Sequence, residues 1–480
     1  MTLANIDAVL VKIAEYVHSD IEFAAAAYAA AKLSLLDSMA CAMLALDKAE
    51  CRQLLGPIMP GTIVPHGSRV PGTNFVLDPI KATFDFGALI RWLDFNDTWL
   101  AQEWGHPSDN IAGILMLADA LTRSGATRFN MRMVLTCIIK AYEIQGILAL
   151  ENAFNRVGLD HVILVKVATA AVAAKMLGGN LAQIISAVSH AWVDGHSLRI
   201  YRHGDQTGPR KSWAAGDASA RGVQLAWIVV CGQQSGFSHA LSASQWGFSA
   251  VSFAGQQIKL GQQFGSYVIE NILYKVKYPA EFHGQTAVEA AIKLQPIISD
   301  QLARIKTINI FTQESAMRII NKSGTLHNYA DRDHCLQYMV AVALLYGTLE
   351  AKHYTDEFAQ SDARIEQLRS KMQLCEDQTY SKNYLDLTKR EIANALQLVF
   401  ADGTTTEKIE IKYPLGHKLR RAESMPDLYT KYANAVSGKF QVEPRAALLA
   451  LWDLSLGEFA AMDVSEYVAL FFIHHNGFLS

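Results

Sequence analysis

Residues 24–46 read AAAAYAAAKLSLLDSMACAMLAL and form the most apolar segment of a 480-residue chain. Alanine and leucine dominate this segment, and both residue types favour a helix. Lys32 and Asp37 interrupt it, so it falls short of the roughly 18 uninterrupted apolar residues expected of a membrane span. We therefore expect a buried core helix at 24–46.

Similar helical patterns recur up to about residue 265. They cover 110–121, 131–150, 162–176, 181–192 and 214–231. The interval 61–79 is rich in proline and glycine and predicts a long ordered loop. Helical patterns return in the tail at 427–473.

The pattern changes after about residue 275. Alternating apolar residues predict strands at 308–312, 396–400 and 409–413, and Asp402-Gly403 is a hairpin signal between the last two. Helical patterns at 333–349 and 363–373 lie among them. Because 480 residues exceed one comfortable core, two domains are expected. We predict a multidomain α and α+β fold: a helical domain of residues 1–275 completed by 416–480, and an α+β domain of residues 276–415.

Composition excludes several classes of function. Half of the residues are apolar, 19% are charged and the net charge is -3, which argues against nucleic acid or an anionic membrane as a partner. The N-terminus lacks a secretory pattern, so we expect a cytoplasmic protein. No two of the six cysteines lie closer than ten residues, which argues against a zinc or iron–sulfur site. We expect no metal and no cofactor.

The densest cluster of ionisable residues is 91–110, RWLDFNDTWLAQEWGHPSDN. Tryptophans stand next to acids, an arginine and a histidine, and aromatic neighbours desolvate such groups and shift their pKa values. The alternative is an ordinary loop packed by its tryptophans, with the acids in water. Both interpretations stay open from the sequence.

Three further segments are candidates. Asp160-His161 begins an apolar helix, whose dipole favours the neutral imidazole that a general base needs, although a buried or capping histidine is the alternative. Segment 194–212 carries cations suited to carboxylates, unless it is a solvated basic loop; these cations are Arg199, Arg202, Arg210 and Lys211. Segment 275–286 stands at the predicted domain junction and is either part of a ligand site or a polar linker.

Residues 91–98 and 105–110 resemble the hallmark of the MmgE/PrpD family. Segments 69–73, 278–283 and 330–335 are similar to it as well, and the resemblance covers nearly the whole chain. It implies an all-helical domain with a smaller α+β domain that acts as a lid. It also implies a cofactor-free carbon–oxygen lyase that removes water from a small tricarboxylate in propionate catabolism.

The resemblance also implies a set of site residues. The active-site pattern of a family decarboxylase that acts on cis-aconitate carries over to Asp94, Thr98, His106, His161, Lys211 and Lys277. Two departures weaken the decarboxylase more than the dehydratase. A family histidine corresponds to Glu281, with His283 two residues on, and a pocket tyrosine has no equivalent at 313–321, where Arg318 is the nearest group for a carboxylate.

We therefore expect proton transfer by His106 and His161 in an unassigned order, with Asp94 and Lys211 as further catalytic residues. Substrate binding is expected from Thr98, Lys277, Glu281, His283 and Arg318. The expected partner is a small-molecule tricarboxylate, without nucleic acid or membrane, and a homodimer is the candidate assembly. Two alternatives remain: another tricarboxylate enzyme of the family, or a non-catalytic helical binding protein in which these clusters need not converge.

Overall fold

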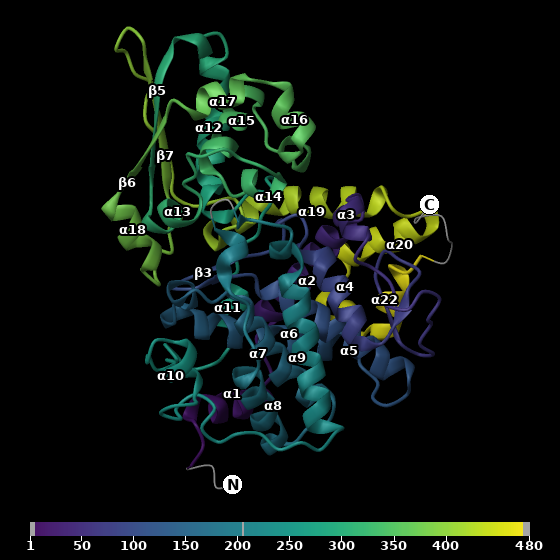
Figure 1. Ribbon diagram of the computed structural model, residues 1–480. Coiled ribbons are helices and arrows are strands. Elements are labelled where there is room, and N and C mark those ends of the chain that lie inside the picture. Colours follow the sequence, from purple (N-terminus) through teal and green to yellow (C-terminus); the bar gives the residue numbers. More distant parts are fainter. Residues whose placement is uncertain (1–4, 204–205, 474–480) are drawn as a thin grey trace. The chain divides into compact units, whose positions relative to one another are not determined.

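The computed structural model describes residues 5–203 and 206–473 (Figure 1). Contacts divide the chain into two compact units. The first contains Met1–Arg199, Ser212–Ile272 and Tyr429–Ser480, and the second contains Ile200–Lys211 and Leu273–Leu428. The short segment Ile200–Lys211 therefore groups with the later part of the chain, and not with the helices on either side of it.

The first unit is helical. Its longer helices are α1 (Ala8–His18), α2 (Ala25–Ala45), α4 (Pro79–Arg91), α5 (Ile111–Arg123), α6 (Met131–Glu151), α7 (Val162–Met176), α8 (Leu181–Val193), α20 (Val442–Asp453) and α22 (Val464–Leu470). Shorter helices are α3 (Ala49–Arg52), α10 (Phe248–Ser252), α11 (Tyr267–Glu270) and α21 (Leu456–Ala461). The predicted loop at 61–79 contains a two-stranded hairpin, β1 (Ser68–Arg69) with β2 (Val76–Leu77). Helices α9 (Arg210–Val230) and α19 (Arg421–Ser437) begin in the second unit and end in the first.

Helix α2 occupies the apolar segment at 24–46 and lies in the core. α2 and α6 are long and apolar enough to cross a membrane, but 72% and 83% of their apolar windows are buried inside the protein, as in core helices. Asp37 on α2 is buried with a partner: Lys431 Nζ lies 2.7 Å from its Oδ1 and 2.7 Å from the carbonyl oxygen of Phe95. This buried pair ties α2 to the loop that follows α4.

Close helix packing in the first unit depends on glycine. A Cβ on Gly87 of α4 would lie 2.6 Å from the Cα of Gly216 on α9, so the two backbones meet where neither residue has a side chain. Helix α7 contacts α5, α6 and α8 and is buried along nearly its whole length. The core therefore holds the N-terminus of α7 in a fixed position.

The second unit contains a four-stranded sheet in the order β6-β5-β7-β8. Its strands are β5 (Ile305–Thr312), β6 (Met372–Glu376), β7 (Asn394–Phe400) and β8 (Ile409–Ile411). Strand β5 pairs with β6 in parallel and with β7 antiparallel, and β7 pairs with β8 antiparallel. The helices of this unit are α12 (Gln285–Ile298), α13 (Glu314–Ile319), α14 (Tyr329–Arg332), α15 (Leu336–Tyr346), α16 (Asp356–Ser361), α17 (Arg364–Arg369) and α18 (Gln378–Leu385). Helix α12 contacts β7 and α15.

The prediction of a mainly helical, multidomain fold with a small sheet is confirmed, and one element differs. The helix predicted at 363–373 ends at Arg369, and β6 begins at Met372. Strand β6 is short and lies at the edge of the sheet with its residues half-buried or exposed, so no buried apolar face marks it in the sequence. Its backbone pairing with β5, 64 residues earlier in the chain, stabilises it instead.

Candidate active site

The loop between α4 and α5 is buried, although it carries four acids. It contains β3 (Trp99–Leu100), β4 (Trp104–Gly105) and the turn Pro107–Asn110. The acids Asp94, Asp97, Glu103 and Asp109 are each at most 2% exposed. The interpretation of this segment as a surface loop with solvated acids is therefore wrong.

Asp97 organises this loop. Its Oδ1 accepts hydrogen bonds from the backbone N–H (3.1 Å) and the hydroxyl (2.6 Å) of Ser108, and its Oδ2 accepts one from the Tyr142 hydroxyl (2.6 Å). Burial raises the pKa of Asp97 to about 6, although the hydrogen bonds from Ser108 and Tyr142 lower it. The carboxyl group thus links the start of the loop, its end and α6.

The backbone of Asp97 also fixes the ring of His106. His106 Nδ1 lies 2.6 Å from the Asp97 carbonyl oxygen, which can only accept, so Nδ1 carries the hydrogen. In the neutral ring, Nε2 then holds the lone pair that takes up a proton. Asp94 Oδ1 lies 3.8 Å from Nε2, and Thr98 Oγ1 lies 3.4 Å from Nδ1.

Asp94 adopts a strained backbone. Its φ is +49°, in the left-handed region that aspartate tolerates better than most residues but that still costs energy. This conformation follows the end of α4, and the carboxylate forms a buried ion pair with Arg91 in the last turn of that helix. The pair keeps a negative charge beside His106 in the protein interior.

His161 lies next to His106. It stands directly before α7, and the two ring centroids are 5.6 Å apart in an edge-to-face arrangement. Its Nδ1 lies 3.3 Å from Asp160 Oδ1. A Cβ on Gly105 would lie 3.4 Å from His161 Cδ2 and 3.0 Å from Gln145 Nε2, so a side chain at this position would press on the Gln145 amide beside the His161 ring. The first unit therefore brings together Asp94, Thr98, His106 and His161.

Lys211 belongs to a second cluster, within the second unit. Its Nζ donates a hydrogen bond to Asp333 Oδ1 and lies 3.0 Å from His334 Nδ1, and all three residues are buried. His334 Nδ1 is also 2.7 Å from Asp333 Oδ1. Asp333 and His334 had no role in the sequence analysis, although the segment 330–335 had been recognised as a motif. The sequence signal that could have pointed to Asp333 and His334 is that two adjacent ionisable residues stand within a motif of the family.

Glu281 and His283 form a buried pair in the same unit. His283 Nδ1 lies 2.8 Å from Glu281 Oε1, and Nε2 lies 3.1 Å from the Tyr384 hydroxyl. Burial alone would raise the pKa of Glu281, but the positive charges of His283, His334 and Lys275 outweigh it and lower the pKa. Glu281 is therefore held in its ionised form. Its backbone N–H donates to the carbonyl oxygen of Asp333, which connects this pair to the segment that holds Lys211.

The remaining predicted cations are dispersed. The half-exposed Lys277 pairs with Asp427 at 3.2 Å, and Arg318, one-third exposed, pairs with Glu314 at 3.6 Å. Arg199 belongs to the first unit, where it faces Glu103 and Asp160. Arg202 and Arg210 both lie against the ring of Tyr201. Residues 204–205 of the predicted basic segment lie outside the described residues.

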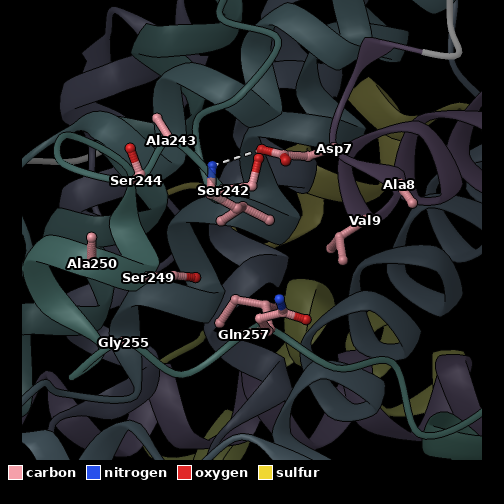
Figure 2. A pocket seen from close by; sticks show the side chains of 12 residues that line it. Asp7, Ala8, Val9, Ser242, Ala243, Ser244, Ser249, Ala250, Gly255 and Gln257 are labelled. Carbon is pink, nitrogen blue, oxygen red and sulfur yellow. Dashed lines mark hydrogen bonds between the residues drawn. The ribbon is translucent and has the colours of Figure 1, made fainter.

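Hollows elsewhere in the first unit contain none of the predicted site residues. One, of about 380 Å³, is lined by polar groups that include Asp7, Ser249 and Gln257 (Figure 2). The Asp7 carboxylate there accepts a hydrogen bond from the backbone of Leu241 at 2.7 Å. Another, of about 490 Å³, lies between α1, α6 and α7. Within residues 5–203 and 206–473, no group of three or more His, Cys, Asp and Glu side chains is arranged to hold a metal.

The comparisons with known proteins all point to one family. The model of the MmgE/PrpD N-terminal domain matches residues 11–261, and that of the MmgE/PrpD C-terminal domain matches residues 278–454. The chain is 50% identical to 2-methylcitrate dehydratase of Escherichia coli strain K12, over 97% of the chain and 98% of that protein. It is 50% identical to 2-methylcitrate dehydratase of Cupriavidus necator, over 97% of each chain. The mitochondrial 2-methylcitrate dehydratase of Yarrowia lipolytica is 48% identical, over 97% of the chain and 90% of that protein.

The Asp97 network leads to a prediction about stability. Tyr142→Phe removes one donor to a buried carboxylate, so we expect it to lower the free energy of unfolding by about 1–3 kcal/mol. Amide hydrogen exchange across 94–110 should become faster, because the loop loses its link to α6. Tyr432→Phe is the matched control, since that buried hydroxyl donates to the carbonyl oxygen of Leu448 at 2.7 Å. The control should lose stability without faster exchange at 94–110; unchanged exchange there in Tyr142→Phe would contradict the role given to Asp97.

Proposed function

Because the chain belongs to the MmgE/PrpD family, we propose that it is a hydro-lyase that removes water from 2-methylcitrate to give 2-methyl-cis-aconitate in propionate catabolism. Half of its residues are identical to those of relatives that are named 2-methylcitrate dehydratase, over nearly the full length of both chains. The observation that carries the proposal is the buried pair His106 and His161, each of which lies beside a carboxylate.

The reaction requires two proton transfers. A base takes a proton from the carbon beside a carboxylate, the electron pair of that C–H bond forms the new double bond, and the C–O bond breaks. The departing hydroxyl receives a proton from an acid and leaves as water. A carboxylate makes the neighbouring C–H bond only weakly acidic, so stabilisation of the developing negative charge is the largest requirement.

His106 and His161 meet the need for one base and one acid. In the neutral form of each ring, Nδ1 carries a hydrogen that points at an oxygen, so the lone pair is on Nε2. A ring that takes up a proton becomes an imidazolium, which Asp94 stabilises at His106 and Asp160 stabilises at His161. This arrangement supports either order of the two roles.

The substrate's carboxylates need cations and donors. We assign Lys211 to one carboxylate, because its ammonium group is held in place by Asp333 and His334. Thr98 serves as a hydroxyl donor to the substrate. We also place Glu281 and His283 in the polar wall of the binding site and Arg318 as a further cation, at the two points where the chain departs from the family pattern.

We further propose a cytoplasmic enzyme without a metal or organic cofactor. All six cysteines are free thiols, which suits a reducing compartment. The relative from Yarrowia lipolytica is named as mitochondrial, so the compartment varies within the family. Proton transfer and charge stabilisation by side chains account for every bond that forms or breaks in the reaction.

Replacing either histidine tests the reaction. We expect His106→Ala and His161→Ala each to lower kcat by on the order of 10²-fold or more, because each loses a proton-transfer group. Turnover is followed by the ultraviolet absorbance of the new double bond, in buffer with and without EDTA. The parent protein should be equally active in both. The matched control is His190→Ala, which removes a histidine that lies against Phe237 and bonds to the Ser235 carbonyl oxygen, and it should leave kcat unchanged. Near-parent turnover by both active-site variants would end the assignment.

Substrate choice follows from the size of one methyl group. A methyl-sized pocket discriminates by roughly 1–3 kcal/mol. We therefore expect kcat/KM for citrate to be lower than for 2-methylcitrate by about 10- to 200-fold, with citrate still turned over. The same assay on both substrates measures this ratio. Equal values would contradict the preference, and release of carbon dioxide from cis-aconitate would favour the family decarboxylase instead.

We also propose that the second unit acts as a lid and that Lys277 joins the substrate when it closes. Lys277 lies shortly after the crossing at Leu273, and its half-exposed ion pair allows it to exchange Asp427 for a substrate carboxylate. Lys277→Met should raise KM by about tenfold, the equivalent of one charge-assisted hydrogen bond. Lys293→Met is the control, since Lys293 pairs with Glu289 at 3.5 Å in the same unit and is about equally exposed. An unchanged KM in Lys277→Met would rule out this role.

A further inference from the structure

Glu103 is a buried acid that the proposed mechanism does not use. It lies in the turn between β3 and β4 and is fully buried. Its Oε2 accepts two hydrogen bonds from Asn155, one from the backbone N–H (2.6 Å) and one from the side-chain amide (2.8 Å). Its Oε1 lies 3.6 Å from Arg199 Nη1. One edge of the carboxylate is therefore fixed while the other faces a single guanidinium.

That guanidinium is shared with a second carboxylate. Arg199 Nη1 also lies 3.9 Å from Asp160 Oδ2, and the group lies against the ring of Trp104, with 5.1 Å to its centroid. The other oxygen of Asp160 is the one that lies 3.3 Å from His161 Nδ1. A continuous chain of charged groups thus runs from Glu103 through Arg199 and Asp160 to His161, entirely within the first unit.

We propose that Glu103 is a positioning residue for His161 and acts through Arg199 and Asp160. The inference rests on the proposed function for the role of His161 in the reaction. With both acids ionised, two negative charges share one arginine in a buried space, where an unbalanced charge is costly. A proton on His161 or on Glu103 reduces the negative charge of this cluster. The protonation of these two residues is therefore coupled.

The direction of the coupling follows from the charges. When Glu103 is ionised, it competes with Asp160 for Arg199 and adds a negative charge near His161, and both effects raise the pKa of the imidazole. When Glu103 is neutral, Arg199 interacts more strongly with Asp160, and the pKa of His161 falls. Burial raises the pKa of Glu103 to about 7; Arg199 and Asn155 lower it and Asp160 raises it. Glu103 therefore changes charge near neutral pH.

The test is Glu103→Gln, which removes the charge and keeps the shape. We expect one limb of the pH profile of kcat/KM to shift to lower pH by on the order of half a unit, while the other limb stays in place. The shifting limb is the acidic one if His161 is the base and the alkaline one if it is the acid. Glu103→Asp keeps the charge and should keep both limbs near their parent positions.

A second measurement does not depend on turnover. An NMR titration of the His161 ring, assigned with His161→Asn, should move to lower pH in Glu103→Gln. This measurement decides the role of Glu103 even if the protein does not dehydrate 2-methylcitrate, so the two proposals fail separately.

Glu143→Gln is the matched control. Glu143 is also a buried acid of the first unit, and it accepts backbone hydrogen bonds from Gly265 (2.9 Å) and Val268 (2.8 Å) instead of facing Arg199. Its replacement should lower stability and leave both limbs and the His161 titration unchanged. The proposal is overturned if Glu103→Gln leaves the His161 titration at its parent position, or if Glu143→Gln produces the same shift.

Discussion

The hydrogen bonds of Asp97 are the constraint on which the candidate site depends. The carboxylate of this one residue holds Ser108 and Tyr142, and its backbone carbonyl fixes the tautomer of His106. A buried carboxylate is costly unless its oxygens are satisfied, so the loop has only one arrangement in which Asp97 is tolerated. The cost of burying Asp97 therefore explains both why its oxygens bond to Ser108 and Tyr142 and why the histidine ring points in a defined direction.

Other buried charges in the protein are also paired. Asp37 is buried against Lys431, Asp94 against Arg91, and Lys211 against Asp333. Replacing such pairs by apolar residues is often neutral or stabilising, so stability alone does not account for them. They hold charges in fixed directions before a ligand arrives, and this preorganisation is what stabilisation of a charged transition state requires.

Much of this was predictable from the sequence, and the reasons for the exceptions are physical. The helices at 131–151 and 162–176 follow from local apolar patterns, and His106 and His161 each stand in a short segment, 91–110 and 160–161, that is rich in ionisable residues or begins an apolar helix. The contacts of Glu103 do not follow from a local pattern, because its partners Asn155 and Arg199 lie 52 and 96 residues further along the chain. Acids in loops usually face water, and burial that depends on distant partners leaves no local pattern. The grouping of Ile200–Lys211 with the second unit depends in the same way on contacts between distant segments.

The distribution of charge separates two tasks. Around the histidine pair, the first unit gathers the acids Asp94, Asp97, Glu103 and Asp160 with the cations Arg91 and Arg199, and each of these arginines already faces carboxylates of the protein. Such a cluster suits proton transfer, because it stabilises imidazolium, but it does not suit a ligand with three negative charges. Binding a tricarboxylate therefore requires cations from elsewhere, and Lys211 and Lys277 of the second unit are those that the family pattern supplies. Under the proposed function, the acid–base residues belong to the first unit and the lysines assigned to the carboxylates belong to the second.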